Sequence, residues 1–240
     1  NKERRYGWFP SISGGWVPTQ YDWYRNLLPF NNFLKFRASW GRVGNDRLKD
    51  ENGNDIRFPY LTTLGNVSST WGTGLAENRT GSMNLKWEVS TKTNFGIDAR
   101  FFDDKVDMTV DFFHTKTTDI FQRRANIPDE GGLSNVLPYA NIGSMKSWGM
   151  DGTLAYTHTF NKDMALTVRG NFTHAENEVI YWEQSGVNYP YQSNSGVPYK
   201  VQRGLIALGL FKDEDDIKSS PKQTFMDNYR PGDIKYKDVN

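Results

Sequence analysis

The sequence has no cysteine, no long apolar run and almost no net charge. Without cysteine, a disulfide framework and thiol chemistry are excluded. No segment approaches the ~20 consecutive apolar residues of a membrane-spanning helix, which leaves open a membrane barrel, because barrel strands alternate instead. Lysine and arginine number 29 against 28 acidic residues, so the basic excess typical of nucleic-acid binding is absent.

What the sequence does have is aromatic residues, at 15% of the chain, and long stretches of alternation. In residues 85–101 polar side chains alternate with an apolar set consisting of Leu85, Trp87, Val89, Phe95, Ile97, Ala99 and Phe101. The alternation resumes in residues 106–112 with the apolar residues now at even positions. Period-two alternation of this length predicts two long β-strands, each wet on one face.

The turn between these two strands sets their register. Facing residues of an antiparallel pair share a face of the sheet, so odd positions must pair with even ones. A two-residue turn at Asp103 and Asp104 meets this condition, and aspartate tolerates the left-handed backbone angles of such turns. It places Arg100 opposite Asp107, whereas a four-residue loop would oppose Asp98 and Asp107, two like charges.

A second hairpin is predicted further along the chain. Residues 144–160 and 164–182 both carry apolar side chains at even positions, so a three-residue turn at residues 161–163 fits. This register places Tyr156 opposite Val168. It also places Gly152 opposite Phe172, so that an aromatic ring lies over a glycine gap.

These patterns predict an all-β fold, an antiparallel up-and-down sheet of about six long strands that forms part of a large transmembrane β-barrel with long extracellular loops. We expect a barrel-wall segment at 1–182, followed by an extracellular loop region at 183–240 that is truncated at the end. Residues 44–84 are interpreted as a long polar loop, and both chain ends as cuts. The strands are expected near 6–17, 33–43, 85–102, 105–121, 144–160 and 164–182. A soluble antiparallel β-sandwich gives similar alternation and remains the alternative.

Several segments resemble the SusC/RagA family of TonB-dependent outer-membrane transporters. The most specific is NLKWEVSTKTNFGIDARFFDDKVDMTVDFFHTKTTDIF, and the others are RYGWFPSISGGW, FLKFRASWGRVGN, NIGSMKSWGMDGTL and PGDIKYKDVN. The resemblance covers most of the chain, more loosely in residues 44–84 and 183–220.

The resemblance implies a segment of a plugged, single-chain barrel of about 22 strands in the cell outer membrane of a Bacteroidetes-type Gram-negative bacterium. Such transporters take up oligosaccharide or peptide nutrients under a SusD-like surface lipoprotein. The TonB-ExbB-ExbD system would energise them through an N-terminal region that we expect to lie outside this segment. Outer-membrane lipid is a further partner, and no enzymatic activity is implied. A siderophore or cobalamin receptor of the same barrel class, or a soluble carbohydrate-binding β-sandwich, would be the alternatives.

Candidate site residues are few. Exposed aromatic side chains can stack on sugar rings, although packing of the loops on one another explains them equally well. The candidates in the long loops are Tyr60, Trp71, Tyr139, Trp182, Tyr189 and Tyr191.

Metal ligation and catalysis have weaker signals. No cofactor is expected of this segment. Asp238 and Asn240 match the first two ligand positions of an incomplete calcium-type loop, so calcium is a candidate ligand of the full-length protein. The acidic run 213–216 is interpreted as solvated loop. Asp107 and Asp111 share a strand face, and a paired, wall-lining role is favoured over catalysis.

Overall fold

The computed structural model describes residues 6–49, 53–70, 72–127, 136–187, 189–226 and 228–238. The chain divides into two units, Asn1–Tyr199 and Lys200–Asn240. Most of the first unit is strand. The second unit contains a pair of short strands and a short helix.

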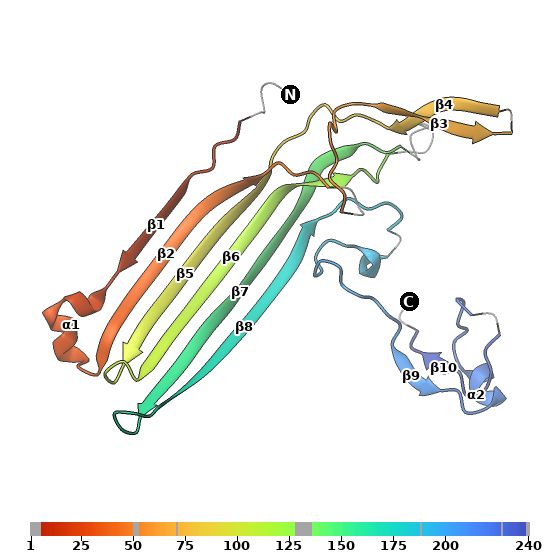
Figure 1. Ribbon diagram of the computed structural model, residues 1–240. Helices are drawn as coiled ribbons and strands as arrows, with labels where there is room; N and C mark the ends of the chain where they lie inside the picture. Colours follow the sequence, from red (N-terminus) through yellow and green to blue (C-terminus); the bar gives the residue numbers. More distant parts are fainter. Residues whose placement is uncertain are drawn as a thin grey trace. The chain divides into compact units, whose positions relative to one another are not determined.

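The first unit is built on a 6-stranded antiparallel sheet (Figure 1). Each of its strands pairs with the next strand of this sheet along the chain, and β3 (Thr63–Ser69) and β4 (Gly72–Arg79) form a separate sheet. The order is β1-β2-β5-β6-β7-β8, which confirms the expected up-and-down topology. The strands are β1 (Ser11–Trp16), β2 (Asn31–Asn45), β5 (Glu88–Phe101), β6 (Val106–Arg123), β7 (Tyr139–Thr159) and β8 (Ala165–Tyr181).

The connections at one end of the sheet are short. A 3-10 turn, η2 (Pro18–Gln20), and a short helix, α1 (Asp22–Leu27), join β1 to β2. The amide of Asn31 at the start of β2 donates to the hydroxyl of Tyr24 at 3.0 Å, which fixes this connection to the sheet. The tight turns β5–β6 and β7–β8 lie at the same end, and the long loops lie at the other (Figure 1).

The predicted β5–β6 register is confirmed. Asp103 and Asp104 both have positive φ angles, 56° and 61°, as a two-residue turn that matches the strand twist requires. Arg100 pairs with Asp107 across the two strands. The guanidinium of Arg100 forms its ion pair with Asp104 in the turn, at 3.4 Å, so the turn contributes to its own electrostatic stabilisation.

The predicted β7–β8 register is confirmed as well. Tyr156 pairs with Val168, and Gly152 pairs with Phe172. A Cβ atom at Gly152 would lie 2.5 Å from the ring of Phe172. The ring therefore occupies the space that a side chain at position 152 would need.

Three expectations about the strands are wrong. Strand β1 begins at Ser11 rather than near Tyr6, because Pro10 cannot donate a hydrogen bond to the ladder. Residues 44–84 are not an unstructured polar loop, because they contain an antiparallel hairpin of β3 (Thr63–Ser69) and β4 (Gly72–Arg79). Its strands are rich in glycine and polar residues, so they give no alternation signal. Strand β7 begins at Tyr139 rather than near Ser144. The register between β6 and β7 shifts around Asp119, whose φ of 55° marks a bulge that changes the phase of the alternation.

The sheet is a single layer with two different faces. The apolar face is the face that carries Trp40 and Trp148, which lie in one line of paired residues across β2, β5, β6 and β7. This face is exposed. Nine of its large side chains expose between 41% and 71% of their surface, namely Ile12, Trp16, Trp40, Phe95, Phe112, Leu154, Tyr156, Val168 and Phe172. The opposite, polar face carries Arg37, Asp98, Asp111 and their neighbours. Within the described residues no second layer covers the apolar face.

None of the helices in the described part of the chain has the length and apolar character of a membrane-spanning helix.

The second unit contains its own small sheet. Strand β9 (Ala207–Leu210) pairs antiparallel with β10 (Ile234–Tyr236), and helix α2 (Glu214–Ser219) lies between them in the sequence. Phe211 exposes 2% of its surface and stacks on Tyr229 at 5.3 Å between ring centroids. The buried ring forms the small core of this unit.

Candidate functional site

A three-residue ion-pair cluster connects three strands on the polar face. Arg37 on β2 donates two hydrogen bonds to Asp98 on β5, Nε to Oδ2 at 2.8 Å and Nη2 to Oδ1 at 3.0 Å. The same Nη2 donates to Asp111 Oδ2 on β6 at 2.9 Å. One planar guanidinium thus bridges two carboxylates, an arrangement that favours arginine over lysine.

A glycine makes this bridge possible. Gly96 on β5 lies between Arg37 and Asp111 in the same register row. A Cβ atom there would lie 2.5 Å from Asp111 Oδ1 and 2.6 Å from Arg37 Nη2. Because glycine leaves the space empty, the guanidinium can pass over the middle strand and reach the third one.

This cluster explains the role of the strand carboxylates. Asp111 is paired, as expected, and its partner is Arg37. Arg100 lies opposite Asp107 as predicted, but it forms its ion pair with Asp104. The polar face therefore carries charges that neutralise one another across strands, which suits a wall in contact with water.

A pocket of about 550 Å³ lies at the long-loop end of the first unit. The lining residues are Ile56, Thr63, Asn78, Arg79, Arg123, Val136, Leu137 and Tyr139. Arg79 Nη2 donates to the carbonyl oxygens of Arg57 and Phe58. The Nε of Arg79 is buried and has no hydrogen-bond partner among the described residues. Two guanidinium groups in one pocket suit an anionic or carbonyl-rich ligand.

The candidate loop aromatics do not form one cluster in the described residues. Tyr139 stacks on Phe121 at 4.7 Å and lines the pocket. Tyr189 and Tyr191 stack on each other at 5.5 Å, next to the 3-10 turn η4 (Pro190–Gln192).

The remaining aromatic candidates lie elsewhere in the loops. Tyr60 packs edge-on against Phe58 at 6.2 Å, and Trp182 tilts against Tyr199 at 5.9 Å. Trp71 lies outside the described residues. Each described candidate thus has an aromatic neighbour, and their binding role stays a prediction.

A buried glutamate that sequence reasoning missed anchors the loops. Glu183 exposes 5% of its surface just after β8. Its carboxylate accepts from Arg124 Nε at 2.7 Å and from the backbone N–H of Asn126 at 3.1 Å. The start of the β6–β7 loop is thereby fixed to the end of β8. The arginine and the glutamate are 59 residues apart, so no local pattern could have paired them.

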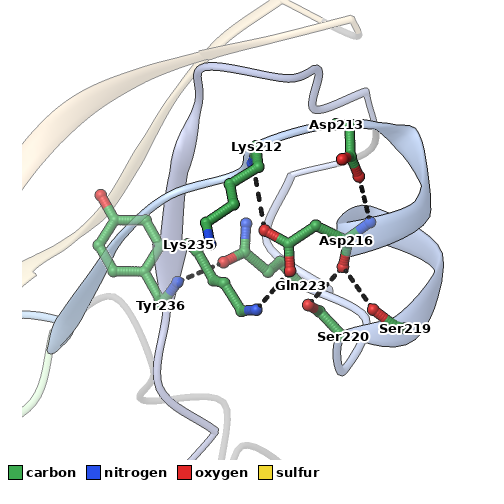
Figure 2. Close-up of polar contacts among 8 residues, drawn as sticks. All are labelled: Lys212, Asp213, Asp216, Ser219, Ser220, Gln223, Lys235 and Tyr236. Carbon is green, nitrogen blue, oxygen red and sulfur yellow. Dashed lines mark hydrogen bonds and ion pairs between the residues drawn. The ribbon is translucent and has the colours of Figure 1, made fainter.

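The acidic run in the second unit has a structural role (Figure 2). Asp213 caps helix α2 by accepting from the N–H of Asp216 at 2.8 Å. Asp216 in turn accepts from Lys235 Nζ and from the N–H of Lys212, at 2.8 and 3.1 Å. The expectation of a solvated loop is wrong in that Glu214, Asp215 and Asp216 begin helix α2, although Asp213, Glu214 and Asp215 are exposed.

Gln223 ties the segment after α2 to β10. Its side-chain oxygen accepts from the N–H of Tyr236 at 2.7 Å (Figure 2). Its amide donates to the carbonyl of Ile234 at 3.4 Å. The Asp216–Lys235 ion pair also joins α2 to β10. Polar contacts therefore hold the helix and the segment after it against β10.

We expect the Asp216–Lys235 contact to make this unit sensitive to acid. The hydrogen bond from Lys235, followed by that from the backbone of Lys212, lowers the pKa of Asp216. A lowered carboxyl pKa contributes stability above the ordinary value of about 3.9, which is lost as the pH falls through the lower folded value. Hydrogen exchange of β9 and β10 should therefore be faster in Asp216→Asn than in wild type at neutral pH, with the difference vanishing in acid.

The matched control is Asp215→Asn. The side chain of Asp215 is 95% exposed and contacts Lys218 at 3.7 Å. Its removal should leave the exchange of β10 unchanged. Equal acceleration by both substitutions would contradict a specific role for Asp216.

The calcium expectation is not supported by any cluster of ligands. Among the described residues no group of three or more histidine, aspartate or glutamate side chains could hold a metal ion. Asp238 is exposed, and Asn240 lies outside the described residues. The calcium-type loop therefore stays a prediction for the full-length protein.

Sequence and structure comparisons identify relatives. Residues 1–229 match the family model described as "TonB dependent receptor-like, beta-barrel". The chain is 33% identical over 179 residues to TonB-dependent receptor P39 of Formosa agariphila, covering 75% of this chain and 16% of that protein. It is 27% identical over 250 residues to TonB-dependent receptor SusC of Bacteroides thetaiotaomicron, covering 98% of this chain and 24% of that protein.

Solved structures of the RagAB peptide transporter have the same fold. One matches with a TM-score of 0.58 at 27% identity, covering 75% of this chain and 19% of the other. Another, in an open-open state, matches with a TM-score of 0.60 at 25% identity over 73% of this chain and 18% of the other. The chain spans no more than a quarter of the length of these relatives. It belongs to the TonB-dependent receptor β-barrel family and, within it, to the SusC/RagA type.

Proposed function

We propose that this chain is a wall segment of an outer-membrane importer that takes up oligosaccharides or peptides. The observation that carries the proposal is the two-faced single-layer sheet. Its apolar face exposes aromatic and aliphatic side chains, whereas its polar face carries the Arg37 ion-pair cluster. A soluble sheet would bury the first face, but a barrel turns it toward lipid and the second toward water.

The dimensions of the apolar face support this placement. On β7 it runs from Trp148 to Phe160, beyond the strand end, with aromatic residues at both limits. That stretch corresponds to about 40 Å of strand, or about 30 Å of height at the usual barrel tilt. The outward apolar band of an outer-membrane barrel is about 25 Å tall and flanked by aromatic girdles, so the fit is close.

The mechanism that we propose is gated passage without catalysis. Ligand is captured at the long-loop end, where the pocket with Arg79 and Arg123 offers charged hydrogen-bond donors. A SusD-like surface lipoprotein would cover this end, and the TonB-ExbB-ExbD system would drive release inward. The pairing with a lipoprotein and the ligand class are supported by similarity to SusC and to the RagAB peptide transporter.

Growth on defined nutrients tests this proposal. A strain in which the gene of the complete receptor is deleted should fail to grow on its oligosaccharide or peptide, and the gene in trans should restore growth. Purification of the tagged receptor should recover a surface lipoprotein. A growth defect that iron chelates or cobalamin alone reverse would instead assign the receptor to the uptake of those compounds.

A further inference from the structure

We propose that a row of cations on the apolar face, at the long-loop end, binds the phosphate group of an outer-leaflet lipid. The inference rests on the proposed function only in that it needs this face to meet lipid. It concerns the outside of the barrel, not the path of the imported ligand.

The row is defined by the strand register. Reading across β2, β5, β6, β7 and β8, one line of paired residues consists of Arg42, Thr91, Lys116, Lys146 and Glu178. Adjacent strands lie about 4.8 Å apart, so the three cations fall within about 15 Å along one level of the sheet. Long arginine and lysine side chains can converge on one phosphate group over such a distance. These three cations are named here the cationic row.

The charges of the cationic row are only partly compensated. Lys146 Nζ lies 2.9 Å from Glu178 Oε2. Arg42 and Lys116 are exposed, and neither forms an ion pair with any residue that the structure describes. Two positive charges, on β2 and β6 with Thr91 of β5 between them, therefore lie on this face without an ion-pair partner among the described residues.

The row lies at the long-loop border of the apolar face, where lipid headgroups would meet the barrel, and it crosses this zone obliquely because barrel strands tilt by about 40°. The next row toward the short-turn end contains Trp40 and Trp148, which have the positions of an aromatic girdle. Lys146 Nζ lies 5.3 Å above the ring centroid of Trp148, a cation–π contact that directs the lysine along the face. The tryptophan row also contains His114 on β6 and Glu176 on β8. Further toward the short turns the same face is mostly apolar down to Tyr156 and Val168, with His174 on β8 as an exception.

The order of charged and apolar side chains along this face indicates which molecule binds there. A molecule bound here meets cations at the loop end and apolar side chains below them. A phosphorylated lipid matches both, because its phosphate can neutralise Arg42 and Lys116 while its acyl chains cover the apolar face. Free phosphate matches only the first part, and the imported ligand would approach from the polar side of the sheet.

Lipid binding to the complete receptor in detergent tests the proposal. The probes are phosphorylated lipid A and the same lipid after removal of its phosphate, with bound lipid measured by native mass spectrometry. Loss of two surface cations should weaken binding of the phosphorylated probe about 25-fold in Arg42→Gln/Lys116→Gln. Glu178→Gln should tighten binding, because it releases Lys146 from its ion pair. A purely structural role of these residues would not produce this gain.

The matched control is Lys92→Gln, which removes an exposed cation of the polar face one position from the row residue Thr91. It should bind lipid like wild type. The proposal is overturned if Lys92→Gln weakens binding as much as the double variant, or if Glu178→Gln does not tighten binding. It is also overturned if both lipid probes bind equally, or if inorganic phosphate displaces the lipid at equal concentration. Ligand uptake in the same variants tests the import proposal separately, because it should not change.

Discussion

Replacing Arg37 by methionine should destabilise the complete receptor by about 3 kcal/mol. Removing one partner of a buried ion pair typically costs 3–5 kcal/mol, because the remaining charge loses its compensation. The side chains of Arg37, Asp98 and Asp111 are 35%, 25% and 17% exposed, which places the expected cost at the lower end of that range. Asp98 and Asp111 would then repel each other across β5 and β6. The midpoint of heat-induced unfolding, followed by electrophoretic mobility, measures the effect.

Two further variants separate charge from packing. Arg37→Lys keeps the charge but loses the fork that contacts both carboxylates, so we expect an intermediate loss. Adding Asp98→Asn and Asp111→Asn to Arg37→Met should recover most of the stability, since no unpaired charge then remains. If the triple variant is as unstable as Arg37→Met, the loss comes from packing and the electrostatic explanation is wrong.

Gly149→Ala should be about as costly, at roughly 3 kcal/mol, for a steric reason. Gly149 on β7 lies between Phe113 on β6 and Ala175 on β8. A Cβ atom there would lie 2.8 Å from Phe113 Cζ and 2.9 Å from the Cα of Ala175, and it would overlap the carbonyl oxygen of His174. Because two of these atoms are backbone, β7 and β8 must move apart. The expected result is a lower unfolding midpoint and a smaller folded fraction after membrane insertion.

Gly170→Ala is the matched control for this substitution. Gly170 lies on the neighbouring strand β8, and a Cβ atom there would meet nothing within 4 Å. It should therefore leave the unfolding midpoint unchanged or raise it slightly, because alanine restricts the unfolded chain more than glycine does. A comparable loss in both variants would mean that strand glycines matter for flexibility and not for strand spacing.

The hairpins were predictable because local chemistry determines their registers. Two aspartates in the β5–β6 turn and the parity of apolar positions were sufficient to place Arg100 opposite Asp107. The same parity argument placed Phe172 over Gly152.

Contacts between distant segments could not be predicted in this way. The pairing of Arg37 with Asp98 and Asp111 depends on the register between β2 and β5, which a long connection separates and no turn specifies. The Arg124–Glu183 ion pair depends on loop ends that meet only in the folded sheet. Hairpin β3–β4 was not predicted because Gly65, Gly72 and Gly74 interrupt the alternation of apolar and polar residues that indicates strands.

The strand order has a consequence for how such receptors diversify. Each strand of the main sheet pairs only with its predecessor and successor, and the β3–β4 hairpin is an insertion between two paired strands. A gene exchange that replaces one hairpin together with its connecting loop therefore disturbs only the two strand pairings at its borders and leaves the other pairings intact. Recombination between paralogues at the tight turns, such as Asp103–Asp104, could transfer an entire external loop while the scaffold persists.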